Sequence, residues 1–169
     1  MKYYENYPVW SVAIVILMFI AVYLAGSYIM FRLHLIAGIL FLIYLFMMEY
    51  YTYKEACPHC YYYGKMCFSG RGLIAQFLYK KGDPKKFCER KIEFKDFLPQ
   101  IIMLAVPIVV GIALLISRGF HLLTLIAVLY PVFNWFFVNP ILYGKLACSH
   151  CKQGKKCCPA LDFFSKKKK

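Results

Sequence analysis

The sequence predicts an all-α integral membrane protein with four transmembrane helices, built as two tandem hairpin repeats, with an interfacial amphipathic helix between them and cytosolic Cys-rich loops. The chain is 62% hydrophobic and 19% aromatic, with a mean hydropathy of +0.56, which exceeds the apolar share of an ordinary soluble domain. Four apolar stretches are each about long enough to cross the hydrocarbon core of a bilayer. The same cysteine pattern, A-C-x-H-C-x6-C, follows each pair of stretches.

The first repeat covers residues 1–72. Pro8 opens its first apolar segment, expected at about 9–31, which contains no charged residue. A second and shorter segment at about 33–48 relies on the tyrosines that follow it to reach the interface. The first cysteine motif, residues 56–67, comes directly after this hairpin.

The linker between the repeats, residues 73–97, is predicted to lie on the membrane surface. Asp83 and Pro84 predict a helix start, with Asp83 as the N-cap and Pro84 at the first helical position. From 85 to 97 aromatic side chains alternate with lysines and acids, a pattern typical of an amphipathic helix that lies along the interface.

The second repeat covers residues 98–169, with spans expected at about 98–117 and 122–138. Asn139-Pro140 should disturb the end of the fourth helix, because proline lacks the amide hydrogen that the helix needs. The second cysteine motif, residues 147–158, follows, and a basic tail comes after it.

The distribution of lysine and arginine predicts the orientation of the chain. Nineteen of these residues lie in the N-terminal lead, the middle segment and the C-terminal tail, and only Arg32 and Arg118 lie in the two hairpins. The positive-inside rule therefore places both termini and both motifs in the cytoplasm of a multi-pass cell-membrane protein. We expect the basic clusters to contact anionic lipid headgroups. A protein partner or a second copy is also possible, and nucleic acid is not expected because no nucleic-acid motif accompanies the charge.

All eight cysteines fall on this reducing side, and none lies in a span. Clustered thiolates with C-x2-C spacing favour a metal site, with zinc first and an iron–sulfur cluster second. The predicted ligands are the eight cysteines, with two histidines as further possibilities: Cys57, Cys60, Cys67, Cys88, Cys148, Cys151, Cys157, Cys158, His59 and His150.

Two ligand arrangements are compatible with the spacing. With separate sites, one centre uses Cys57, Cys60, Cys67 and either Cys88 or His59, and the other uses Cys148, Cys151, Cys158 and either Cys157 or His150. With a shared site, the pairs Cys57/Cys60 and Cys148/Cys151 meet on one ion. The duplication makes sharing natural, whereas the count of eight suits two centres of four ligands.

The leading functional hypothesis is a non-catalytic adaptor, sensor or electron-carrying module in which metal stabilises the cytosolic loops. The alternative is a membrane thiol–disulfide oxidoreductase that uses the two C-x2-C pairs. In its favour, Cys57-Pro58-His59-Cys60 is similar to the active-site tetrapeptide of DsbA-type thioredoxin-fold oxidoreductases. No residue is assigned a catalytic role, so whether the protein is an enzyme stays open. A transporter is disfavoured because the predicted spans carry no Lys, Arg, Asp or Glu and Asn134 is their one deep polar group.

Overall fold

A computed structural model describes residues 3–89 and 93–157 of the chain. The chain divides into two compact units. The first, which we call the motif unit, combines three separate segments, 1–16, 50–93 and 140–169. The second, the span unit, combines 17–49 and 94–139.

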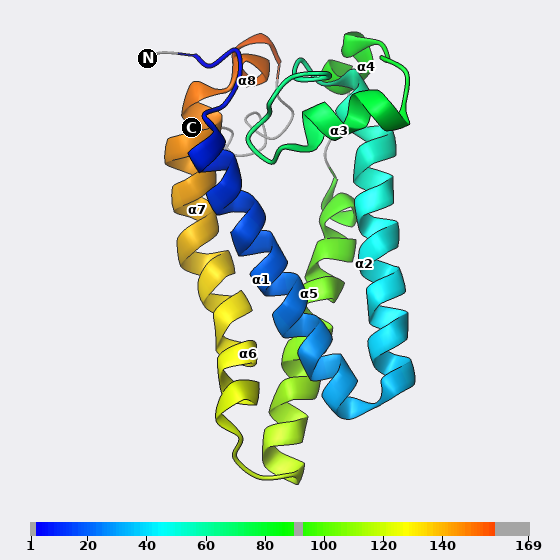
Figure 1. Cartoon of the computed structure of the whole chain (residues 1–169), viewed down its shortest axis with the longest axis vertical. Coiled ribbons are helices and arrows are strands. Elements are labelled where there is room, and N and C mark those ends of the chain that lie inside the picture. The colour runs from blue at the N-terminus through cyan, green and yellow to red at the C-terminus, as the bar shows by residue number, and fades with distance from the viewer. Residues whose placement is uncertain (1–2, 90–92, 158–169) are drawn as a thin grey trace. The chain divides into compact units, whose positions relative to one another are not determined.

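Within the described residues, four helical stretches are long and apolar enough to cross a membrane. The first three are α1 (Val9–Leu33), α2 (Leu35–Glu55) and α5 (Phe94–Ser117), seen in Figure 1. The fourth, Leu122–His150, contains α6 (Leu122–Phe133), the π-helical segment η2 (Asn134–Val138), α7 (Asn139–Ile141) and the π-helical segment η3 (Leu142–Ala147). For the described residues, the structure therefore confirms the prediction of a helical chain with four helices that are long and apolar enough to span a membrane.

The outward faces of these helices are apolar. Phe46, Ile116 and Leu17 are exposed by 81%, 80% and 65%, respectively. A helix satisfies its own backbone hydrogen bonds, so such a surface is stable in lipid and costly in water. The exposed apolar side chains are therefore suited to a hydrocarbon environment.

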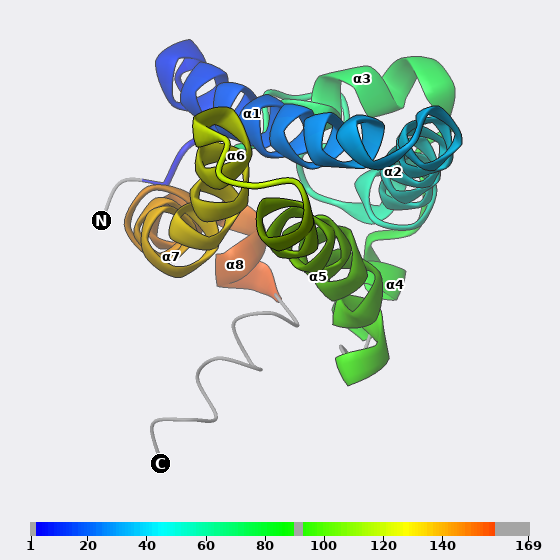
Figure 2. The same ribbon diagram turned by 90° about the horizontal axis from the view of Figure 1, so that it is seen from below.

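The span unit is organised around its part of α1. One cluster packs Ile29 of α1 against Leu114 of α5 and Val128 of α6. A second cluster packs Met30 of α1 against Phe41 of α2. The end view in Figure 2 shows α1 beside both α2 and α6.

Two tight turns close the hairpins of the span unit. Only His34 separates α1 from α2, and its amide donates to the carbonyl of Met30 at 3.2 Å. Gly119 has a φ of +82° in the turn between α5 and α6, a conformation that glycine adopts without steric cost. The turns thus lie where the sequence predicted them.

The helix ends differ from the predicted ones in two places. The second helix was expected to end near 48 but continues to Glu55, since hydropathy marks the edge of the hydrocarbon and not the end of the backbone hydrogen bonding. The fourth helix was expected to end near 138 but continues past Pro140. The π-helical turns on both sides of α7 accommodate the missing amide of that proline.

Among the described residues, the linker region contains two short helices, α3 (Arg71–Leu78) and α4 (Pro84–Glu89). The helix predicted over 85–97 includes residues 90–92, which lie outside the described residues. The predicted start is confirmed, because the Lys85 amide donates to Asp83 Oδ1 at 2.9 Å. The exposed Phe77, at 83%, gives α3 an apolar outer side suited to an interface.

Candidate metal centre

The C-x2-C turns of the two cysteine motifs fold in the same way. A one-turn 3₁₀ helix covers Cys57–His59 (η1) and Cys148–His150 (η4). In each, the amide of the second cysteine donates to the carbonyl of the first at 3.3 Å. Cys60 and Cys151 then leave the turn in extended conformations, with φ, ψ of −81°, 149° and −80°, 118°. Each C-x2-C pair is therefore bent by the same local geometry.

A reciprocal pair of hydrogen bonds joins the motifs. The Tyr61 amide donates to Gln153 Oε1 at 2.8 Å, and the Lys152 amide donates to the Tyr62 hydroxyl at 3.1 Å. Tyr61 and Lys152 hold the same place in the two motifs, as do Tyr62 and Gln153. Each motif thus gives one amide to the other and receives one in exchange, which is the pattern of a local pseudo-twofold axis.

The residues that accept these bonds are buried, with Tyr62 exposed by 2% and Gln153 by 5%. A buried polar group costs free energy unless it is hydrogen-bonded, so the two side chains fix how the motifs meet.

The N-terminal segment before α1 ties the two motifs together. The Tyr4 amide donates to the His150 carbonyl at 3.1 Å, and the Tyr62 hydroxyl donates to the Tyr4 carbonyl at 2.9 Å. The hydroxyl of the buried Tyr7 donates to the Ala147 carbonyl at 2.7 Å. Burial raises the pKa of Tyr7 above its ordinary value, with a further contribution from Cys151.

The carboxylate of Glu5 adds a charged link in the same place. It pairs with Lys65 after the first C-x2-C pair at 3.0 Å and with Lys152 after the second. The Tyr61 hydroxyl also donates to it at 2.8 Å. Because Glu5 is 56% exposed, these ion pairs contribute little to the free energy of unfolding.

Thiols of both motifs lie around Cys60. The pKa of Cys60 is raised to about 12, mainly by burial; a backbone hydrogen bond from Tyr62 lowers it, and the charges of Cys67, Cys151 and Cys57 contribute to the rise. The structure thus places three cysteines of the first motif and one of the second within electrostatic reach of each other. A metal-free Cys60 keeps its proton at neutral pH and is a poor nucleophile.

The Cys67 sulfur is held by the loop that follows it. The Gly72 amide donates to this sulfur at 3.2 Å. A side chain at Gly72 would bring a Cβ within 2.2 Å of the Tyr62 carbonyl oxygen, so only glycine allows this close approach.

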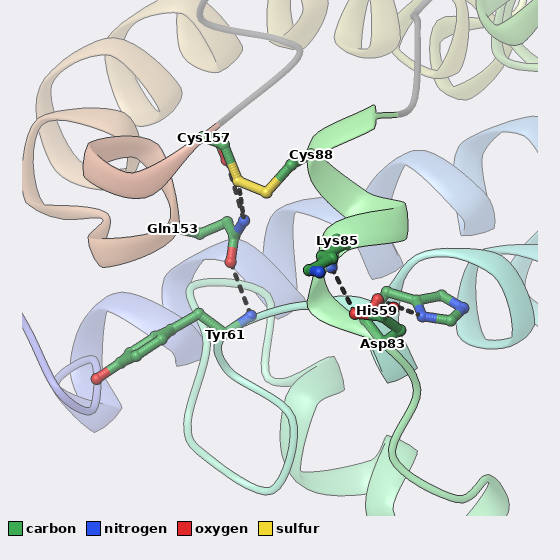
Figure 3. The surroundings of a disulfide bond; sticks show 7 residues. All are labelled: His59, Tyr61, Asp83, Lys85, Cys88, Gln153 and Cys157. Atoms are coloured by element: carbon green, nitrogen blue, oxygen red, sulfur yellow. Dashed lines mark hydrogen bonds between the residues drawn. A yellow bond between two sulfur atoms is a disulfide. The ribbon is translucent and has the colours of Figure 1, made fainter.

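The two predicted histidine ligands lie in different surroundings. His59 Nδ1 lies 3.0 Å from the carbonyl oxygen of Asp83, as Figure 3 shows. The Gly82 backbone packs against the same ring. The His150 ring packs against Tyr4, with ring centroids 4.9 Å apart and the ring planes tilted by 36°. In each motif the histidine contacts a segment outside the motif.

A disulfide joins Cys88 of α4 to Cys157, with Cα atoms 5.3 Å apart. Gln153 Nε2 donates to the carbonyl and the sulfur of Cys157 at 3.0 and 3.3 Å. In Figure 3 Gln153 lies between this bond and the Tyr61 amide. The sequence placed these two cysteines in separate ligand sets, but bonded sulfurs offer no thiolate to a metal. Among the described residues, five cysteines lie outside the disulfide: Cys57, Cys60, Cys67, Cys148 and Cys151.

Within residues 3–89 and 93–157, no three His, Cys, Asp or Glu side chains are arranged to hold a metal ion as they stand. The chemistry of the donors does fit zinc, which prefers thiolate and imidazole ligands. Cys158, predicted as a ligand of the second site, lies outside the described residues.

Tyr62 and Gln153 were not predicted as functional residues from the sequence. Aligning the motifs on their first cysteines puts both at the same position, and that alignment could have identified them. The chain matches no protein-family model, no curated protein and no solved structure in comparison.

Proposed function

We propose that this membrane protein binds one metal ion between its two motifs, with Cys57, Cys60, Cys148 and Cys151 as ligands. The reciprocal pair of hydrogen bonds carries the proposal. It joins equivalent positions of the two motifs, so the two C-x2-C turns are related as the halves of a shared site would be.

Three further observations support sharing over separate sites. The thiols around Cys60 come from both motifs. Cys157, needed by one form of the second separate site, is bonded to Cys88. The two histidines are occupied with backbone and ring contacts outside their motifs.

Zinc is the first candidate, because four thiolates from two C-x2-C turns match its tetrahedral preference. An iron–sulfur cluster, which also takes four thiolates, is the second. With zinc the centre would clamp the loops and serve as an adaptor or sensor, whereas with iron and sulfide it would carry electrons. Metal binding requires a deprotonated Cys60, so it releases protons.

The proposal extends to the placement of the chain in the membrane. The two hairpins and their motifs are two tandem repeats, with α3 and α4 in the linker at the interface. Both termini and both motifs face the cytoplasm of the cell membrane, as the distribution of lysine and arginine supports. The basic clusters then face anionic lipid, and a protein partner or second copy would meet the motif unit.

Elemental analysis and an optical spectrum of protein purified anaerobically in detergent test this proposal. We expect one metal ion per chain, lost in both Cys60→Ser and Cys151→Ser. The double variant Cys88→Ser/Cys157→Ser is the matched control, because it removes two cysteines outside the proposed ligand set without freeing a new thiol. If the wild type binds two ions per chain and each ligand variant keeps one of them, the shared site is refuted. Absence of metal, with the thiols of Cys57, Cys60, Cys148 and Cys151 all reactive, would overturn metal binding.

The disulfide favours one second candidate, thiol–disulfide exchange. A dithiol partner would reduce Cys88–Cys157, so that the partner gains a disulfide and this chain gains two thiols. Thiol trapping after treatment with a dithiol tests this idea. If the bond resists millimolar reductant in the folded protein, exchange is not its role.

A further inference from the structure

The hairpin end of the span unit carries an arginine pair within one hydrogen-bond network. Arg32 Nη1 donates to the Thr124 hydroxyl at 3.1 Å and to the Tyr28 hydroxyl at 3.3 Å. Arg118 Nη1 donates to the Arg32 carbonyl at 2.9 Å. Thr124 is only 2% exposed, so Arg32 is anchored from a buried position. Each hairpin thus supplies one guanidinium.

Among the described residues of the span unit, this positive charge has no acidic counterpart nearby. The two acids of the span unit, Glu49 and Asp96, belong to the ends of α2 and α5 that are remote from the hairpin turns. At 1.5 Å per residue, Glu49 is about 20 Å along α2 from the turn. In the bonds above, each arginine donates through Nη1 only. The Nε and Nη2 groups of both arginines therefore remain to donate to a ligand. An arginine fork matches the oxygens of a phosphate.

An apolar groove begins beside this network. It has a volume of about 290 Å³ and is lined by Ala21, Ala25 and Tyr28 of α1 and by Leu123, Ile126 and Ala127 of α6. Tyr28, which binds Arg32, and Leu123, the neighbour of Thr124, mark its hairpin end. Tyr130 also lines it and donates to the sulfur of Met18 at 3.2 Å.

From Ala21 to Tyr28 the groove follows about 10 Å of helix. It therefore offers apolar length along the helix axis, with donors for an anion at one end only. A ligand that fills both parts must be amphipathic, with a phosphate at one end and an alkyl chain at the other. In a membrane-spanning unit that description fits a phospholipid.

We propose that the groove between α1 and α6 binds an anionic phospholipid, with its phosphate at Arg32 and Arg118 and one acyl chain along Ala25. The small side chains of Ala21 and Ala25 leave the room for the chain. The two arginines favour a lipid of net negative charge over a zwitterionic one, because a zwitterionic headgroup brings its own cation. The site is independent of the metal proposed for the motif unit.

Native mass spectrometry of the detergent-solubilised full chain, titrated with phosphatidylglycerol, phosphatidylcholine or inorganic phosphate, tests the proposal. We expect phosphatidylglycerol to bind at least about tenfold more tightly than phosphatidylcholine. Arg32→Gln should weaken it by about tenfold, the size of one lost charge-assisted hydrogen bond. Lys95→Gln removes a charge at the remote end of α5 and should leave binding unchanged.

Filling the groove separates a lipid from a free anion. Ala25→Leu should weaken phosphatidylglycerol by at least tenfold and leave any binding of inorganic phosphate as it was. Because Ala25 also contacts the packed core, Ala21→Leu repeats the test at a second position. Arg118→Gln does the same for the headgroup, in case Arg32→Gln unfolds the chain.

Equal binding of the two lipids would overturn the proposal, as would groove variants that bind phosphatidylglycerol like the wild type. Inorganic phosphate that displaces the lipid from wild type and from Ala25→Leu equally well would identify a free-anion site instead. A second copy of the chain bound in place of lipid, seen as a dimer that Ala25→Leu dissociates, would also refute it.

Discussion

Removing one hydroxyl group should test the contact between the motifs directly. Tyr62→Phe deletes the group that accepts the Lys152 amide at 3.1 Å and donates to the Tyr4 carbonyl at 2.9 Å. Because the Tyr62 side chain is only 2% exposed, water has little access to the Lys152 amide and the Tyr4 carbonyl once the hydroxyl is removed. An unsatisfied buried group costs about 1–3 kcal/mol, so we expect a loss of about 2 kcal/mol in the free energy that holds the motifs together.

This loss should appear in the affinity for metal. If only a fraction of the metal-free chains keeps the motifs joined, the apparent Kd rises by the inverse of that fraction. A cost of 2 kcal/mol corresponds to about 30-fold, which lies within the 10- to 100-fold range typical of residues that support metal ligands. Competition with a chromophoric zinc chelator at fixed pH measures the change.

Tyr63→Phe is the matched control. Its hydroxyl donates to the Tyr79 carbonyl at 2.7 Å, so the substitution removes a comparable bond that stays outside the contact between motifs. The argument is refuted if the two variants bind zinc equally, or if Tyr62→Phe binds like the wild type.

Three further predictions concern packing, pH and surface charge. Gly111→Ala brings a Cβ within 2.4 Å of Val128 and should cost about 1–3 kcal/mol, whereas Gly144→Ala meets nothing within 4 Å; comparable thermal shifts for the two would contradict this. The pKa of Cys60 rises in the fold from 9.0 to about 12, so the unfolded chain loses this proton first as pH rises. The contribution of Cys60 to the thermal stability of the metal-free protein should therefore be intact below pH 9 and be lost as the pH rises towards 12. Cys60→Ser should remove this fall of stability with pH. Glu5→Gln should lower the free energy of unfolding by less than about 1 kcal/mol, and added salt should remove this difference from the wild type. A difference that grows at high salt would contradict the role given to the ion pairs of Glu5.

The helices of the span unit could be predicted from the sequence because length and hydropathy alone determine them. The start of α4 at Pro84 could also be predicted, because Asp83 and Pro84 start a helix through local interactions. The course of the chain past Pro140 was not. Whether a proline ends a helix or is absorbed by π-helical turns depends on the packing on both sides, and a single sequence does not contain that information.

The residues that supply the sulfur atoms of the candidate site could be predicted from the sequence, but the contacts that join them could not. The two motifs identified the cysteines, but the disulfide from Cys88 to Cys157 depends on a fold that brings together residues 69 positions apart. The contact through Tyr62 and Gln153 was missed because a tyrosine and a glutamine do not resemble each other. Only their shared position reveals that each serves the same purpose.

The discontinuity of the motif unit has a consequence for biosynthesis. Its three segments, 1–16, 50–93 and 140–169, leave the ribosome separated by the hairpins, and Cys148 follows Cys57 by 91 residues. At about 5–20 residues per second, the first motif waits roughly 5–20 s for its counterpart. During that interval its thiols, its Tyr62 hydroxyl and the N-terminal tyrosines lack the partners that the second motif supplies. Assembly of the motif unit is thus a late event that requires the last span to be made, and a chain truncated before residue 147 would display exposed thiols for the cell to detect.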